Sequence, residues 1–80
     1  MTVAEVKSLQ RGQILYHVRH KNADGSPQSW RVNGRVRMWK RDSQRVEVPL
    51  KHGLYSHGTL YLHPAQQSGN LEEFTLSAEG

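Results

Sequence analysis

Basic and aromatic side chains lie close together in the middle of this 80-residue chain. Guanidinium and ammonium groups bind phosphates and carboxylates, and aromatic rings stack on nucleobases. The spacing of these residues therefore predicts a surface for nucleic acid or for an acidic protein surface. The candidate contact residues are Arg31, Arg35, Arg37, Trp39, Lys40, Arg41, Arg45, Lys51 and Tyr55.

Charge is distributed unevenly along the chain. Residues 1–52 contain all eleven Lys and Arg against four acidic residues, a balance of +7, whereas residues 53–80 contain only Glu72, Glu73 and Glu79. The formal net charge at pH 7 is +4. Such a chain can present an anion-attracting face opposite a neutral or acidic one. Ordinary surface charge that maintains solubility is the competing interpretation.

The other polar residues give little support to catalysis or metal binding. The chain has no cysteine, which excludes thiolate zinc ligands, cysteine nucleophiles and disulfides. Neither a G-x-S-x-G nucleophile elbow nor a Gly-rich phosphate-binding motif is present in the sequence. Of the five histidines, His17 and His20 are expected on opposite faces of a strand, away from a shared metal. We therefore predict a non-catalytic binding protein without cofactor or metal.

The elements that must position the candidate residues are mostly short strands. Thr2 and Glu5 have the spacing of a capping box, and apolar residues three apart predict a helix over 3–10. Residues 13–77 then show a period of two in short runs separated by turn-forming residues, including a loop at 21–27. The predicted strands are 14–19, 28–32, 35–40, 46–50, 59–62 and 73–76.

The whole chain, residues 1–80, is predicted to form one mainly β domain. Because a chain this small fills only a small core, and because curvature protects strand edges, we expect a strongly curved structure. An SH3-like barrel or a strongly bent antiparallel sheet of five to six short strands fits best, together with the short N-terminal helix. An open sheet with the helix packed on one face is the main alternative. Pro49 has no N–H to donate, which predicts an edge position for its strand.

Asn33-Gly34 is the strongest hairpin signal in the chain. A two-residue type I′ turn would pair Val32 with Arg35 and Trp30 with Arg37, which mixes apolar and cationic side chains on one face. A three-residue loop with Gly34 in the left-handed region would instead pair Arg31 with Arg35. We favour this second register, which buries Trp30, Val36 and Met38 and turns Arg31, Arg35 and Arg37 outward.

A second candidate loop lies around Tyr55, between Gly53 and Gly58. The two glycines can permit backbone angles that present Tyr55 as a recognition loop. The alternative is a tight connection in which Leu54 and Tyr55 plug the end of the barrel.

Four segments together resemble small uncharacterised proteins of tailed bacteriophages and prophages. The resemblance spans roughly residues 9–60 and is carried by residues 21–25 (KNADG), 31–34 (RVNG), 39–41 (WKR) and 51–55 (KHGLY). It implies a setting, the cytoplasm of an infected bacterial host cell, and transfers no activity. Small phage proteins often bind nucleic acid or redirect a host protein, and this analogy fits a binding protein.

The leading prediction is a phage-type protein that binds DNA or RNA through the arginine-rich hairpin face. The alternative is a phage protein that docks on an acidic surface of a host protein and inhibits or redirects it. No membrane contact is predicted, because no apolar run exceeds three residues, against about 20 for a membrane span. The pattern indicates neither the type of nucleic acid nor the oligomeric state.

Overall fold

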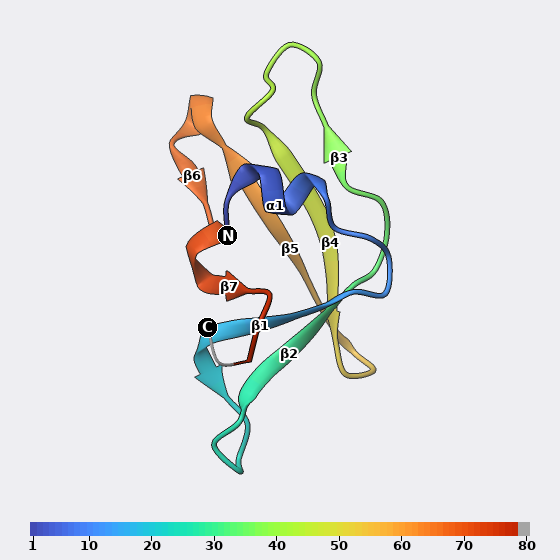
Figure 1. Ribbon diagram of the computed structural model, residues 1–80, viewed down its shortest axis with the longest axis vertical. Helices are drawn as coiled ribbons and strands as arrows, with labels where there is room; N and C mark the ends of the chain where they lie inside the picture. The colour runs from blue at the N-terminus through green and yellow to red at the C-terminus, as the bar shows by residue number, and fades with distance from the viewer. Residues whose placement is uncertain (79–80) are drawn as a thin grey trace.

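The computed structural model describes residues 1–78, so that Glu79 of the acidic C-terminal segment lies outside the described residues (Figure 1). One short helix, α1, spans Val3–Lys7. The strands are β1 (Ile14–Lys21), β2 (Pro27–Val32), β3 (Arg37–Met38), β4 (Val46–His52), β5 (Ser56–His63), β6 (Ser68–Gly69) and β7 (Phe74–Thr75). Two single 3-10 turns, η1 (Pro64–Gln66) and η2 (Leu71–Glu73), flank β6.

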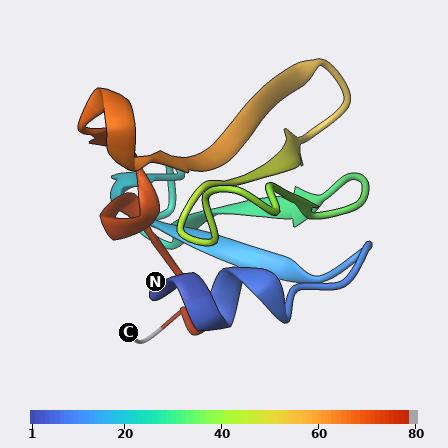
Figure 2. The same ribbon diagram turned by 90° about the horizontal axis from the view of Figure 1, so that it is seen from above.

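The strands form one antiparallel sheet in the order β6-β5-β4-β2-β1-β7, and β3 adds a further pair with β4. The sheet curls strongly into a half-barrel, which Figure 2 shows from above. The mainly β class, the strongly bent antiparallel sheet and the short N-terminal helix are thus confirmed. The sequence pattern did not predict β6 or the two 3-10 turns, whose runs are too short to show a period.

Helix α1 is confirmed but ends at Lys7, earlier than predicted. The backbone N–H of Glu5 donates to Thr2 Oγ1 (3.1 Å), and the backbone N–H of Thr2 donates to Glu5 Oε1 (2.9 Å). The hydrogen bond from the Thr2 backbone N–H favours the ionised carboxylate and lowers the pKa of Glu5. A helix this short is not stable alone, so burial of Val6 against the sheet must hold it in place.

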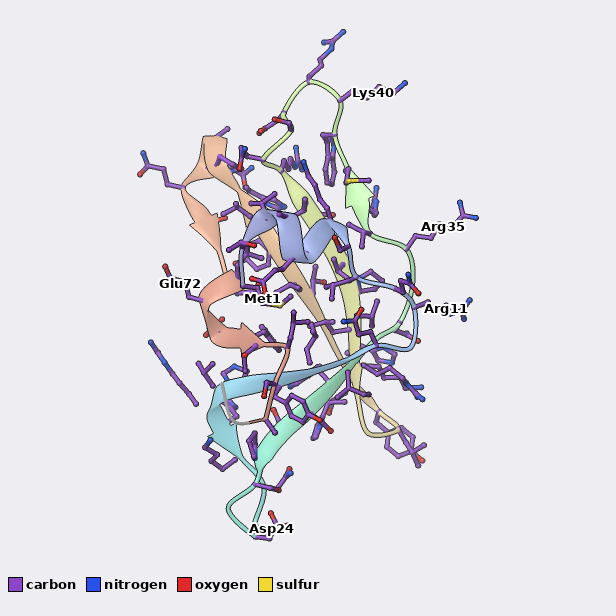
Figure 3. The ribbon with its side chains drawn as sticks, viewed as in Figure 1. Met1, Arg11, Asp24, Arg35, Lys40 and Glu72 are labelled. Atoms are coloured by element: carbon purple, nitrogen blue, oxygen red, sulfur yellow. The ribbon has the colours of Figure 1, made fainter. Side chains whose placement is uncertain are left out.

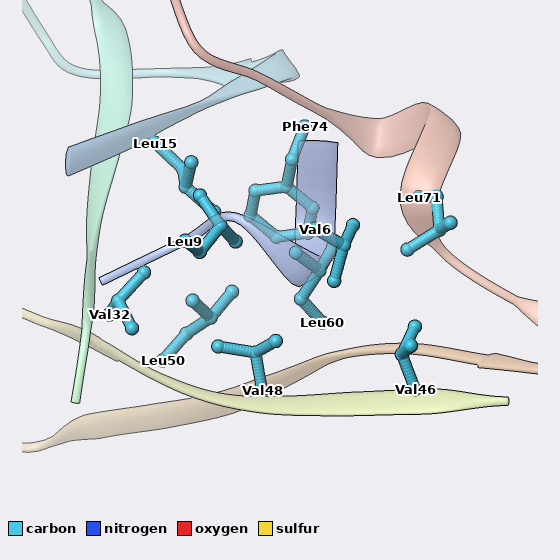
Figure 4. Close-up of a cluster of buried hydrophobic side chains, with 10 residues drawn as sticks. All are labelled: Val6, Leu9, Leu15, Val32, Val46, Val48, Leu50, Leu60, Leu71 and Phe74. Carbon is cyan, nitrogen blue, oxygen red and sulfur yellow. The ribbon is translucent and has the colours of Figure 1, made fainter. Parts of the chain in front are cut away.

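Ten apolar side chains fill the concave side of the sheet (Figure 4). Strand β4 contributes three of them at alternate positions, Val46, Val48 and Leu50, as its period of two predicted. The other seven are Val6, Leu9, Leu15, Val32, Leu60, Leu71 and Phe74.

The predicted hairpin at Asn33-Gly34 is wrong, because β2 and β3 do not pair with each other. Both pair with β4, one after the other, with Val32 opposite Leu50 and Met38 opposite Val46. Residues 31–38 therefore run along β4 as one interrupted strand, in which four residues, 33–36, lie opposite two, 48 and 49. Met38 is 58% exposed at the end of this strand instead of buried. Trp30 and Val36 are half-buried against the core.

Pro49 explains where this interruption falls. The backbone N–H of Asn33 donates to the carbonyl oxygen of Pro49 (2.8 Å), so the polar side of Pro49 faces β2 and β3. A residue in an antiparallel ladder directs its N–H and C=O to the same neighbour, so the missing N–H of Pro49 also faces residues 33–36. Proline fits an internal strand at such a bulge. The predicted edge position is wrong, since β5 pairs with the other side of β4.

Gly34 lies against the ring of Pro49 at this bulge. A Cβ atom on Gly34 would stand 2.7 Å from Pro49 Cγ, well inside van der Waals contact. The predicted left-handed conformation of Gly34 is wrong, because its φ is not positive. Position 34 favours glycine because the Pro49 ring leaves no room for a Cβ atom, and not because of a special backbone angle.

A second irregularity lies in β1, between Tyr16 and Lys21. The buried ring of His17 occupies it, and His17 Nδ1 accepts hydrogen bonds from the backbone N–H groups of Arg19 and His20, both at 3.1 Å. The bulge brings the rings of His17 and His20 to a centroid distance of 4.1 Å, so their predicted placement on opposite faces is wrong. Burial lowers the pKa of His17, and the neighbouring charge of His20 lowers it further.

The contact of Gly34 with Pro49 predicts a double-mutant result. Gly34→Ala should lower the free energy of unfolding by about 1–3 kcal/mol, because the new methyl group overpacks against the proline ring. Pro49→Ala removes Cγ. In the Pro49→Ala background, the additional Gly34→Ala substitution should therefore cost much less free energy of unfolding than it does in wild type. Chemical denaturation checks this cycle. Equal losses from Gly34→Ala in both backgrounds would contradict the contact.

His17 predicts a loss of stability in mild acid. Because the folded-state pKa lies below the ordinary value of 6.5, the unfolded chain takes up the proton first. Stability should be complete above about pH 6.5 and fall as the pH drops toward the folded-state pKa. Thermal unfolding of wild type between neutral and mildly acidic pH should show this fall. His17→Gln should reduce it, whereas His57→Gln, at an exposed position, should not.

Candidate functional site

The sheet surface turned away from the core carries three of the candidate residues, Arg31, Arg37 and Lys51. Since Val46, Val48 and Leu50 are buried, the alternate residues Glu47, Pro49 and Lys51 of β4 lie on the opposite surface. Residues directly opposite in an antiparallel sheet share a face. We call this surface the outer face. It includes Arg31 of β2, Arg37 of β3 and His57, Thr59 and Tyr61 of β5, which lie opposite these positions of β4.

Three basic side chains form a row across the outer face. Arg31 lies opposite Lys51, and Lys51 lies opposite His57 on its other side. Arg31 and His57 are exposed, and Lys51 is half-buried. Neither Arg31 nor Lys51 forms an ion pair among residues 1–78. The row, Arg31-Lys51-His57, is called the cationic row below.

The cationic row replaces the predicted pair of Arg31 with Arg35. The cross-strand partner of Arg31 is Lys51, because β2 pairs with β4 and not with the segment that follows Gly34. Two like charges directly opposite each other destabilise a sheet by about 0.2–1 kcal/mol. An anion between them removes that repulsion.

Arg35 and Arg37 follow Arg31 along the chain, in the bulge and in β3. They line a shallow hollow of about 360 Å³ together with Glu47, Pro49 and Thr59. Arg37 Nη1 is 3.8 Å from Glu47 Oε1, and 69% of the Arg37 side chain remains exposed. An ion pair this exposed contributes little, so Arg37 stays accessible to another anion.

The structure adds a basic residue that the sequence pattern missed. In Figure 3, Arg11, Arg35 and Lys40 project from the same side of the molecule, and Glu72 projects from the opposite side. Hydrogen bonds between the turn after α1 and Val32 bring Arg11 to this side: the N–H of Gly12 donates to Val32 O (2.8 Å), and the N–H of Val32 donates to Gln13 O (2.8 Å). Nothing in the local sequence around Arg11 indicates this long-range contact.

Trp39 and Arg45 have a structural role at the base of the β3–β4 connection. The Arg45 guanidinium lies 4.1 Å from the centroid of the Trp39 ring, and Arg37 lies 5.7 Å from it. Glu47 Oε2 is 3.9 Å from Arg45 Nη2 and 2.6 Å from His63 Nε2. The Arg45 guanidinium thus lies over the half-buried ring of Trp39. Lys40 and Arg41 extend into solvent at the tip of the connection.

The turn between β4 and β5 presents two apolar side chains to solvent. Gly53, Leu54 and Tyr55 form it, with Gly53 at φ +65°, where glycine is favoured. Leu54 is 75% exposed and Tyr55 is 89% exposed. Plugging of the barrel end by these residues is therefore wrong, and Tyr55 lies in the turn two residues before His57 of the cationic row.

The predicted site residues thus fall into two groups. Arg31, Lys51 and Tyr55 lie together at one end with His57, which the sequence prediction missed. A hairpin turn centred on Leu54 would have indicated His57, because Lys51 and His57 stand three positions to either side of Leu54. The other group lies toward the opposite end and consists of Arg35, Arg37, Trp39, Lys40, Arg41 and Arg45.

No family model matches the sequence, and comparisons with curated proteins and with solved structures give no match. The resemblance to phage proteins therefore stays a prediction. Within residues 1–78, no three His, Asp or Glu side chains are grouped closely enough to hold a metal ion. No helix in that part of the chain is long and apolar enough to span a bilayer.

The contacts of Glu47 predict a specific loss of stability. Glu47→Gln should lower the free energy of unfolding by about 1 kcal/mol, because the side chain is mostly buried, pairs with Arg37 and Arg45 and forms a hydrogen bond with His63. Glu72→Gln makes the same charge change at an exposed site and should stay within about 0.5 kcal/mol of wild type. Urea denaturation compares the two. Equal effects would contradict an organising role for Glu47.

Proposed function

We propose that this protein is a non-catalytic nucleic-acid-binding protein that contacts phosphates through its outer face. The observation that carries the proposal is the cationic row, in which Arg31 and Lys51 lie opposite each other and, within residues 1–78, neither forms an ion pair with an acidic side chain. Such a pair costs folding free energy, and binding of a polyanion compensates for it. Spaced cations on an exposed sheet match the repeated charges of a nucleic-acid backbone.

The remaining charges extend the contact surface along the molecule. Arg35, Lys40 and Arg41 are exposed toward the other end, and Arg11 projects on the same side (Figure 3). The molecule measures 43 Å along its longest axis, which allows several successive phosphates to be bound. Glu72 projects on the opposite side, so the electrostatic potential is more positive on the side of Arg35 and Lys40 than on the side of Glu72.

The proposed setting follows from the resemblance to phage proteins and is the cytoplasm of an infected bacterial cell. A second candidate function is docking on an acidic surface of a host protein. The exposed Leu54 and Tyr55 favour it, because an aromatic side chain among cations is a common hot spot. Nucleic acid is preferred because further exposed cations extend from the region of the β4–β5 turn toward the other end of the molecule.

Salt dependence of binding tests the proposal. Fluorescence anisotropy with labelled DNA and RNA should show affinity that falls steeply as salt rises. Arg31→Ala/Lys51→Ala should weaken binding and reduce the slope of log affinity against log salt by about 1.4 to 1.8, the effect of two lost phosphate contacts. Lys7→Ala/Lys21→Ala, with the same charge change away from the cationic row, should leave most of the affinity intact.

Two results would overturn this function. Undetectable binding of DNA and RNA at low salt, where cation–phosphate attraction is strongest, rules it out. Equal losses in the two double variants would show that total charge, and not the outer face, determines binding. Retention of one protein from nuclease-treated bacterial lysate, lost in Arg31→Ala/Lys51→Ala, would support host-protein docking instead.

A further inference from the structure

We infer that the bound nucleic acid is single-stranded and that an unpaired base stacks at the β4–β5 turn. The inference rests on the proposed function and specifies the form of its ligand. It starts from the juxtaposition of exposed apolar side chains with the cationic row. Leu54 and Tyr55 lie in the turn of the β4–β5 hairpin, and one residue pair, His52 opposite Ser56, separates this turn from the pair of Lys51 and His57.

A shallow hollow lies beside this turn. Its lining combines apolar Ile14 and Leu54 with cationic Arg31 and Lys51, and Ser29 and Gly53 complete it. Its volume of about 320 Å³ is at the small end of the range for ligand pockets, about 300–1,000 Å³. An apolar surface flanked by two cations suits a ligand that joins a flat ring to an anion. A nucleotide with its base unstacked from its neighbours has this chemistry.

Tyr55, the neighbour of Leu54 in the same turn, adds a stacking surface outside the lining of the hollow. The side chain is 89% exposed, and its ring makes no aromatic or cation–π contact among residues 1–78. Trp39 differs in this respect, because the Arg45 guanidinium covers it at 4.1 Å. Seven consecutive residue pairs between β4 and β5 hold the base of the turn. Tyr55 is therefore free to stack yet anchored next to the cationic row.

This arrangement suits a single strand better than a duplex. In a duplex the faces of the bases are stacked on one another, and a protein reads their edges with polar side chains in a groove. The Leu54 side chain cannot donate or accept a hydrogen bond, so the hydroxyl of Tyr55 is the one polar side-chain group in Gly53-Leu54-Tyr55. Unpaired bases expose their faces, and aromatic side chains beside a basic surface bind them with little sequence preference.

The experiment compares ligands and variants by fluorescence anisotropy at low salt. The probes are oligothymidylate and oligouridylate of about 20 nucleotides, long enough for one binding site, and a mixed-sequence DNA duplex of the same length. Wild type should bind the single strands at least about tenfold more tightly than the duplex. Tyr55→Ala should weaken single-strand binding by about tenfold, the effect of one lost stacking contact, and leave duplex binding unchanged.

Two variants control for the chemistry and the position of the substitution. Tyr55→Phe should retain single-strand affinity, because stacking needs the ring and not the hydroxyl. Met38→Ala removes an exposed apolar side chain at a distance from the turn and should have no effect. Tight binding of either oligothymidylate or oligouridylate supports the inference, and their ratio assigns DNA or RNA.

Three outcomes would overturn the inference, and they separate it from the proposed function. Equal affinity for single strand and duplex, unaffected by Tyr55→Ala, removes the stacking site but leaves phosphate binding in place. Failure of every oligonucleotide to bind removes both. Binding to phosphatidylserine vesicles that depends on Tyr55, without oligonucleotide binding, would assign the turn to a lipid surface and would also remove both.

Discussion

The pairing of β4 with strands on both of its sides is the constraint on which the rest of the structure depends. On one side β4 pairs with β5 along its whole length, and on the other it pairs first with β3 and then with β2. The alternation of its side chains places Val48 in the core and Lys51 on the outer face. The same strand therefore organises both the hydrophobic core and the proposed binding surface.

The features that could be predicted from the sequence are those encoded by near neighbours. The capping box of Thr2 and Glu5 and the alternation of Val46, Val48 and Leu50 depend on residues within a few positions, and both were predicted correctly. The curvature of the sheet also followed from the short strands and small apolar content.

Features set by distant partners could not be predicted in this way. The hairpin signal of Asn33-Gly34 is a local preference, and pairing of both flanking segments with β4 overrides it. The bulge at His17 depends on a side chain that bonds to its own backbone, which alternation does not reveal. The outward direction of the arginines was predicted, but their neighbours were not, because Lys51 and Arg11 come from other parts of the chain.

The two ends of the outer face hold their charges in different ways. Glu47 neutralises and positions the cations near Trp39, whereas the Arg31-Lys51 pair has no acidic partner among the described residues. A surface that leaves such a pair exposed next to Tyr55 is less favourable for stability and better suited to an anionic ligand with a flat ring. This contrast is the physical basis for assigning ligand binding to that end of the molecule.

The most direct test of this account is chemical-shift mapping by NMR on titration of the isotope-labelled protein with a short single-stranded oligonucleotide. The account predicts that the backbone amides of Arg31, Lys51, Tyr55 and His57 shift most and that those near Glu72 on the opposite side stay unchanged. Absence of shifts, or shifts centred on the Glu72 side, would contradict it.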